Sequence, residues 1–287
     1  MKCRKCGEKA VTNLRAYRIA LCGGCFLKFY RKLVERSIKK YSIFRKNDKI
    51  LLAVSGGKDS AAMACVLRDI GYDFSMLHID LGIGNYSKDS RKKVEELAEI
   101  LDRELYVISL HEYGFEISDV KSKTCSACGI AKRYIMNRFA REKGFSVVAT
   151  GHTAEDIVSF YLKNIAGGQK EYAEKLLPRI EPFSEMVVAK AKPIFEMSEK
   201  ENMLYAVLKK LPIKFEDCPY APKPDWKEIV YEIERRKPGF VKNFLRGLLV
   251  KSREMPEAKK CSICGEISTG EICAFCKLRI KLGALKP

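Results

Sequence analysis

The spacing of the cysteines constrains the fold of this chain more than any other feature of its sequence. Ten of the twelve cysteines form five Cys-x-x-Cys pairs. Near the amino terminus two pairs are separated by fifteen residues, and near the carboxyl terminus two pairs are separated by eight. Both arrangements are typical of zinc ribbons, in which four thiolates surround one zinc ion. The predicted ligands are Cys3, Cys6, Cys22 and Cys25 for one zinc, and Cys261, Cys264, Cys273 and Cys276 for a second.

The alternative for these quartets is a set of disulfides. Disulfides are stable in an oxidising compartment and rare in a reducing one, so the cellular compartment decides between disulfides and metal binding. The first residues, MKCRKCGEKA, lack the apolar stretch of a secretory signal, and no apolar run approaches the roughly 18 residues that cross a bilayer. We therefore expect a cytoplasmic protein that does not engage a membrane. Reducing conditions there favour metal binding over disulfides.

The chain is strongly basic, with a formal net charge of +18. Two zinc-bound quartets would lower this to roughly +14, because each Zn(Cys)₄ centre carries about −2. This charge favours nucleic acid as a partner, although a solvated, lysine-rich surface explains it equally well. The single glutamine and the many Lys and Glu residues indicate a thermophile.

Between the two quartets, short apolar runs alternate with helical patterns, which is typical of a mostly parallel sheet covered on both faces. The predicted strands are 49–55, 74–80, 104–110 and 145–151, and the predicted helices are 59–71, 87–101, 129–143 and 154–165. We predict an α/β fold in four parts: an N-terminal zinc ribbon (1–28), a basic helical linker (29–47), a central domain (48–250) and a C-terminal zinc ribbon (251–287).

The sequence AVSGGKDSAAM joins the first predicted strand to its helix. Two glycines let backbone amides approach a phosphate, and the helix N-terminus offers free N–H groups. Lys58 adds charge, Ser55 and Ser60 add hydroxyls, and Asp59 would hold Mg²⁺ or cap the helix. The loop lacks the spacing of the Walker motif. It resembles the PP-loop of ATP pyrophosphatase-type enzymes, which cleave ATP between the α and β phosphates and adenylate a substrate.

Three further cysteines, Cys125, Cys128 and Cys218, belong to neither quartet. The first two are expected just before a helix, with Lys132 one turn beyond Cys128 on the same face. Cys65, in an apolar helix, is interpreted as a core residue. Three thiols suit an iron–sulfur cluster with one open iron, or a redox pair plus a third thiol. A third zinc completed by a histidine such as His111 or His152 is the structural alternative.

Together these motifs resemble one family. The order of two ribbons, SGGKDS, CSACGIAKR, TGH with an acid four residues after the His, and CPYA is similar to that of the tRNA 2-thiouridine synthetases. These belong to the TtcA/TtuA group of PP-loop tRNA thiolation enzymes. The resemblance covers essentially the whole chain and implies that the central domain is a parallel-sheet PP-loop catalytic domain.

The resemblance also implies cofactors and partners. A 4Fe-4S cluster would be bound by Cys125, Cys128 and Cys218, beside ATP, Mg²⁺ and two zinc ions. The enzyme would adenylate the C2 oxygen of a tRNA uridine and replace it with sulfur. The sulfur would come from a ubiquitin-like thiocarboxylate protein or free sulfide, and a homodimer is expected. Catalytic roles would fall to Asp59, Lys132, Asp156, Cys128 and Cys218. ATP would be bound by Ala53, Ser55, Gly56, Gly57, Lys58, Asp59, Ser60, Ile79, Lys132, Gly151 and Asp156.

Some positions depart from the pattern of the relatives. Leu81 stands where many have an acid, and Thr153 and Glu155 stand where Asn and Asp are common. These departures concern RNA specificity, and both uridine 54 and uridine 34 remain open as targets. Three rival functions also remain. They are sulfur transfer through a Cys128/Cys218 persulfide without a cluster, ATP-dependent amination as in lysidine synthesis, and a non-catalytic RNA-binding zinc protein.

Overall fold

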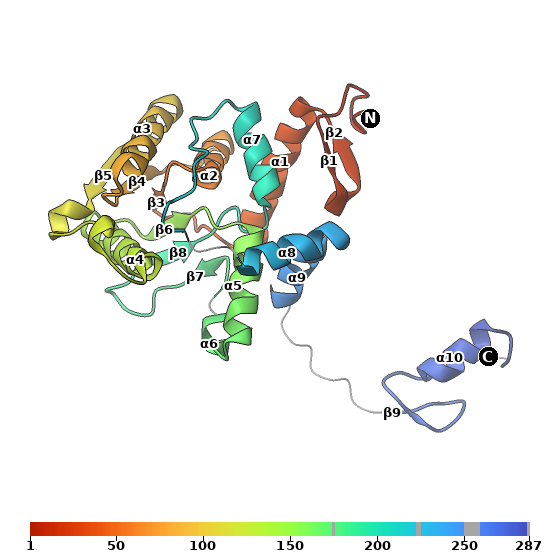
Figure 1. The fold of residues 1–287 in the computed structure, drawn as a ribbon. Helices are drawn as coiled ribbons and strands as arrows, with labels where there is room; N and C mark the ends of the chain where they lie inside the picture. The colour runs from red at the N-terminus through yellow and green to blue at the C-terminus, as the bar shows by residue number, and fades with distance from the viewer. Residues whose placement is uncertain (174–175, 222–224, 250–258, 286–287) are drawn as a thin grey trace. The chain divides into compact units, whose positions relative to one another are not determined.

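The computed structural model describes residues 1–173, 176–221, 225–249 and 259–285. Its centre is a six-stranded sheet in the order β5-β4-β3-β6-β8-β7 (Figure 1). All neighbouring strands pair in parallel except β7 with β8. The strands are β3 (Ile50–Ala53), β4 (Ser75–Asp80), β5 (Leu105–Ser109), β6 (Val147–Thr150), β7 (Arg179–Ile180) and β8 (Ala189–Ala191). The α/β fold predicted from the sequence is thereby confirmed.

Helices cover both faces of this sheet, because the strands carry apolar side chains on both faces and each face must be shielded from water. On one face Leu52 and Met76 pack with α2 (Lys58–Asp69), α3 (Gly84–Leu101), α7 (Glu199–Leu208) and α1 (Gly23–Lys40). On the other face Leu51, Leu77 and Val148 pack with α4 (Thr124–Glu142). Helix α5 (Ala154–Ala166) follows β6, and α6 (Lys170–Ala173) extends it.

The N-terminal ribbon is built onto this core. Strands β1 (Thr12–Leu14) and β2 (Ile19–Leu21) form a hairpin around the short turn η1 (Arg15–Tyr17), and α1 begins directly after Cys22. Phe26 and Tyr30 of α1 are fully buried in the main core. The segment predicted as a linker, 29–47, thus consists largely of the second part of a core helix.

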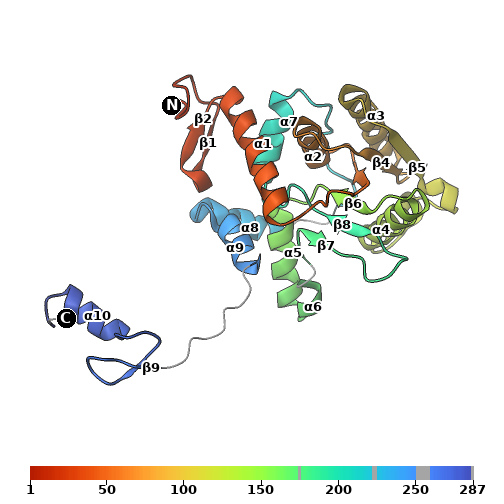
Figure 2. The same cartoon turned by 180° about the vertical axis from the view of Figure 1, so that it is seen from behind.

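The chain divides into two compact units, Met1–Gly247 and Leu248–Pro287. The first also contains α8 (Asp225–Arg236), most of α9 (Phe240–Leu249) and the turns η2 (Leu110–Tyr113) and η3 (Ile117–Asp119). The second holds β9 (Lys259–Lys260), β10 (Ile267–Ser268) and α10 (Ala274–Lys281); Figure 2 shows the elements from behind. No helix among the described residues is long and apolar enough to cross a membrane.

Two helices begin several residues earlier than predicted: α3 begins at Gly84 instead of residue 87, and α4 shows the larger difference. Helix α4 begins at Thr124 instead of Gly129, so Cys125 and Cys128 lie within its first turns and not before it. The stretch CSACG has no apolar periodicity, and Gly129 is a poor helix former, so the sequence pattern becomes helical only after the helix has begun.

Candidate active site

A cavity of about 350 Å³ opens at the carboxyl ends of β3, β4 and β6, where parallel sheets usually bind ligands. Most of the residues predicted to bind ATP line it. These are Ala53, Ser55, Gly57, Asp59, Ser60, Ile79, Lys132 and Gly151. Gly56, Lys58 and Asp156 are not among its lining residues.

Hydrogen bonds and close packing hold the loop from Ser55 to Ser60 at the N-terminus of α2. Ser60 Oγ accepts the N–H of Ser55 at 3.2 Å and donates to the carbonyl of Gly57 at 3.0 Å. Gly56 has a φ of +81°, and a Cβ there would lie 2.8 Å from the carbonyl oxygen of Ser90. A Cβ on Gly151 would lie 3.1 Å from the Ser60 nitrogen. Gly56 therefore requires glycine, whereas a side chain at Gly151 would press on the start of α2.

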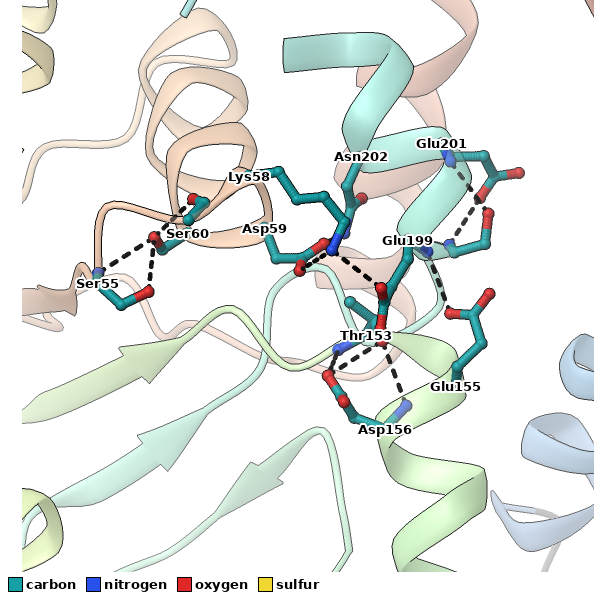
Figure 3. A network of polar contacts seen from close by, with 12 residues as sticks. Ser55, Lys58, Asp59, Ser60, Thr153, Glu155, Asp156, Glu199, Glu201 and Asn202 are labelled. Atoms are coloured by element: carbon teal, nitrogen blue, oxygen red, sulfur yellow. Dashed lines mark hydrogen bonds and ion pairs between the residues drawn. The ribbon is translucent and has the colours of Figure 1, made fainter. Parts of the chain in front are cut away.

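Lys58 is turned toward two carboxylates (Figure 3). Its Nζ lies 3.0 Å from Asp59 Oδ2 and 2.9 Å from Glu199 Oε2. Burial alone would lower the pKa of Lys58, but these carboxylates raise it overall, so the ammonium stays charged. Lys58 lines a second cavity, of about 870 Å³, in place of the first.

Among the described residues that line the first cavity, Asp59 is the one with a carboxylate side chain. Its Oδ1 accepts the Nδ2–H of Asn202 at 2.8 Å. Burial raises the pKa of Asp59 above its usual range, against the opposing effect of Lys58. A divalent cation would reverse that shift by favouring the carboxylate.

Asp156 serves as a helix cap. Its Oδ2 accepts the N–H of Thr153 at 2.9 Å and the hydroxyl of the same residue at 3.0 Å, which completes a capping box at the start of α5. Its Oδ1 forms an ion pair with Lys227 Nζ at 2.6 Å. Burial would raise its pKa, but Lys227 lowers it overall. Each oxygen of Asp156 thus has a partner within the protein, as each oxygen of Asp59 also has.

The two departures in GHTAED have structural roles. Thr153 is buried and caps α5 through its hydroxyl, which is a role that asparagine also performs. Glu155 is buried as well and accepts the backbone N–H of Glu199 at 3.1 Å. Leu81 lies in an apolar cluster with Ile83 and lines the cavity, so an acid there would be buried among apolar side chains.

Sequence reasoning missed four polar residues at this site, Glu199, Asn202, Lys227 and His78. Glu199 also pairs with Lys227, so it links the two lysines. His78 lines the cavity, and its Nδ1–H donates to the carbonyl of Val54 at 3.0 Å. Burial lowers its pKa and keeps the ring neutral. A signal for two of these residues is present in the sequence. The pattern Ser198-x-x-Glu201 is a capping box, which predicts that a helix begins at Glu199 and includes Asn202.

The three central cysteines lie beside the cavity. Cys128 and Cys218 pack against one apolar cluster, and the Cys125 thiol donates to the carbonyl of Tyr220 at 2.7 Å. Their sulfurs are not all within 4.8 Å of one another. A single zinc would require that closeness, whereas a four-iron cluster spreads its thiolates because each binds a different iron. A wider separation of the three sulfurs is compatible with a cluster.

Each terminal quartet does meet the requirement for a single ion. Within each, all four sulfurs lie within 4.8 Å of one another. Cys6 Sγ lies 3.4 Å from Cys22 Sγ, and Cys264 Sγ lies 3.7 Å from Cys273 Sγ. Tetrahedral zinc with bonds of about 2.3 Å would separate its sulfurs by about 3.8 Å. Both quartets fit zinc.

Comparison with known proteins gives a consistent result. Residues 30–218 match a family described as a PP-loop domain, and residues 2–27 match the N-terminal LIM domain of the 2-thiouridine synthetase TtuA. The chain is 39% identical to a tRNA-5-methyluridine(54) 2-sulfurtransferase of Pyrococcus horikoshii, over 96% of this chain and 93% of that one. It is 38% identical to the protein of the same name from Thermotoga maritima, over 97% and 96%.

A solved structure extends the comparison. The U34-tRNA thiolase NcsA from Methanococcus maripaludis, described with its 4Fe-4S cluster, aligns with a TM-score of 0.76 and 26% sequence identity. The alignment covers 100% of this chain and 98% of that one.

Proposed function

Because this chain belongs to the TtuA family of PP-loop tRNA 2-sulfurtransferases, we propose that it adenylates the C2 oxygen of a tRNA uridine and replaces that oxygen with sulfur. The observation that carries this proposal is the position of the phosphate loop. Its cavity is lined by Lys132, and Lys132 lies one helical turn from Cys128 on α4. A nucleotide and a sulfur site would therefore be adjacent.

The first chemical step follows from the loop. The C2 oxygen of uridine attacks the α phosphorus of ATP, the bond to the β-phosphate oxygen breaks, and N3 of the base loses its proton. The amides at the start of α2 and the hydroxyl of Ser55 would hold the departing pyrophosphate, while Ser60 keeps the loop in shape through its bonds to Ser55 and Gly57. Asp59 would carry Mg²⁺, and Lys132 would neutralise charge that develops at the α phosphate.

In the second step a sulfide nucleophile adds to C2, and the C2–O bond breaks to release AMP. Cys125, Cys128 and Cys218 would hold the 4Fe-4S cluster, which supplies an iron without a protein ligand that can bind a sulfur species. The partly buried site would exclude water that competes for the activated base.

We further propose that the target is 5-methyluridine 54. The relatives at 38–39% identity bear that name, whereas the U34 thiolase is 26% identical. The basic surface and the ribbons would hold tRNA through its backbone. The sulfur donor, the homodimer, the bound Mg²⁺ and zinc and a cytoplasmic location remain predictions.

The test uses full-length protein purified without oxygen and reconstituted with iron and sulfide. It is mixed with tRNA lacking 2-thio groups, ATP, Mg²⁺ and sulfide, and the nucleosides are analysed by mass spectrometry. We expect 5-methyl-2-thiouridine, one AMP per thiolation, and about four iron and two zinc per chain. Cys128→Ala should lose iron and thiolation, and the matched control Cys65→Ala should retain both.

Other results would point to specific rivals. Three zinc ions without iron would make the central cysteines structural. Two zinc ions without iron, with thiolation intact, would favour a persulfide on Cys128 or Cys218. Absence of tRNA-dependent AMP release would leave an RNA-binding protein that is not a sulfurtransferase.

A further inference from the structure

A short segment connects the phosphate loop directly to one of the central cysteines. Residues 213–218, here called the strap, begin at Ile213, which is buried in the main core. The N–H of Lys214 donates to the carbonyl of Gly56 at 2.9 Å, and Gly57 and Lys214 pair as a parallel bridge. Four residues later the strap ends at Cys218. The loop that would hold phosphate and a cysteine that would hold the cluster are thus joined by one hydrogen-bonded backbone.

The side chain of Lys214 anchors the strap on a second side. Its Nζ donates to the carbonyl of Tyr86 at 2.8 Å and lies 3.5 Å from the centre of the Tyr86 ring. The side chain is only 7% exposed, and among the described residues its ion pair is a long one, 3.9 Å from Nζ to an oxygen of the exposed Glu216. Burying an ammonium is costly unless its charge is compensated. Here the Tyr86 carbonyl and ring supply most of that compensation, so the Lys214 side chain is held in this position.

Tyr86 lies between the two sites that the strap joins. It lines the nucleotide cavity, and it packs against the same apolar cluster as Cys128 and Cys218. Beyond Cys218 the chain turns, with the N–H of Ala221 donating to the Cys218 carbonyl at 2.9 Å. The thiol of Cys125 then contacts the Tyr220 carbonyl, as described above. Lys214 therefore connects Gly56, Tyr86 and the Cys125–Cys218 region.

We propose that Lys214 is a positioning residue that fixes Cys218 relative to the phosphate loop, so that nucleotide binding and the geometry of the central cysteines are linked. Its value for catalysis rests on the proposed function, since both steps of that reaction need the nucleotide and the sulfur site in register. A displacement of about 1 Å between reacting groups can reduce a rate by two orders of magnitude. Lys214 itself touches neither reacting atom in this scheme.

The variant Lys214→Met tests this proposal, because methionine keeps the apolar stem on the Tyr86 ring and removes the ammonium. Lys190→Met, at an exposed lysine of β8, is the matched control. The readout is the rate at which iodoacetamide alkylates Cys218 in full-length, zinc-containing protein before iron is added. Peptide mass spectrometry follows the reaction with and without α,β-methylene-ATP.

In the unaltered protein and in Lys190→Met, the nucleotide analogue should slow alkylation of Cys218. In Lys214→Met, alkylation of Cys218 should be about fivefold faster or more and should no longer respond to the analogue. The dissociation constant of the analogue should change by less than about threefold, because the backbone bond to Gly56 remains. In the thiolation assay the same variant should lose about tenfold in kcat with little change in the KM for ATP.

Identical alkylation rates and an identical response to the analogue in Lys214→Met would overturn the proposal. If that variant does not fold, Lys214→Gln keeps a donor for the Tyr86 carbonyl and should give an intermediate effect; an unchanged Cys218 there would also overturn it. The alkylation assay requires no tRNA. If the unaltered protein does not thiolate tRNA, the proposed function is wrong. The alkylation result still tests the role of Lys214 independently.

Discussion

At the scale of single residues, Glu155 is the carboxyl group whose titration should be most visible in stability. Burial raises its pKa from 4.5 to about 7, with further contributions from the charges of Glu199 and Glu201. Between pH 4.5 and 7 the folded protein therefore binds more protons than the unfolded chain, so stability falls as the pH rises through this window. The shift corresponds to a loss on the order of 3 kcal/mol in the free energy of unfolding, complete above pH 7.

Glu155→Gln should remove this effect, because the amide oxygen can still accept the N–H of Glu199 and carries no charge. We expect the variant to be more stable than the unaltered protein at pH 8 by about 3 kcal/mol, and nearly equal to it at pH 4.5. Urea unfolding at both pH values measures the difference. Equal stability of the two proteins at pH 8 would show that Glu155 ionises in the folded state without cost.

The same scale shows what the sequence can and cannot predict about the site. Ser55, Asp59 and Ser60 follow from one local pattern, because a strand, a glycine pair and a helix place them together within six residues. The pairing of Asp156 with Lys227 joins residues 71 positions apart in sequence, and no local pattern encodes that meeting. Sequence reasoning thus places the loop well but cannot predict which partners occupy Asp156.

At the scale of elements, α1 is connected to the phosphate loop by hydrogen bonds that pass through a residue of α7. Tyr30 of α1 is fully buried, stacks on Tyr205 of α7 at 4.3 Å between ring centres, and donates to Asn202 Oδ1 at 2.7 Å. Asn202 in turn donates to Asp59. The helical periodicity of α1 was readable from sequence, but its apolar face gave no indication of which helix it would meet.

Tyr30→Phe keeps the ring stacking and leaves the Asn202 carbonyl without its donor. We expect a loss of about 1–3 kcal/mol in the free energy of unfolding, together with weaker ATP binding because Asn202 is freed to rotate away from Asp59. Tyr41→Phe is the control, since the Tyr41 hydroxyl is only part-buried in its bond to Glu196. Denaturant unfolding and ATP titration measure both; a Tyr30→Phe cost no larger than that of Tyr41→Phe would contradict the prediction.

At the scale of the whole molecule, the two cysteine quartets looked equivalent in sequence and differ in structure. Cys3 and Cys22 are buried in the main hydrophobic core together with Leu21 and Phe26. Cys261, Cys273 and Cys276 form a small cluster within the second unit, with only Ile272 and Leu285 packed against it among the described residues. Cys-x-x-Cys spacing specifies the metal site, whereas attachment to a core depends on the flanking apolar residues.

Loss of the two metals should consequently have different effects. Cys22→Ser should lose one zinc per chain and lower the Tm of the main transition by at least about 5 °C, because the ribbon and the start of α1 share that core. Cys273→Ser should also lose one zinc but leave the main transition within about 1 °C, since unfolding would be confined to the second unit. Metal analysis and calorimetry of both variants measure this. Equal shifts of the main transition would mean that the second unit stabilises the first, and that the chain unfolds as one cooperative structure.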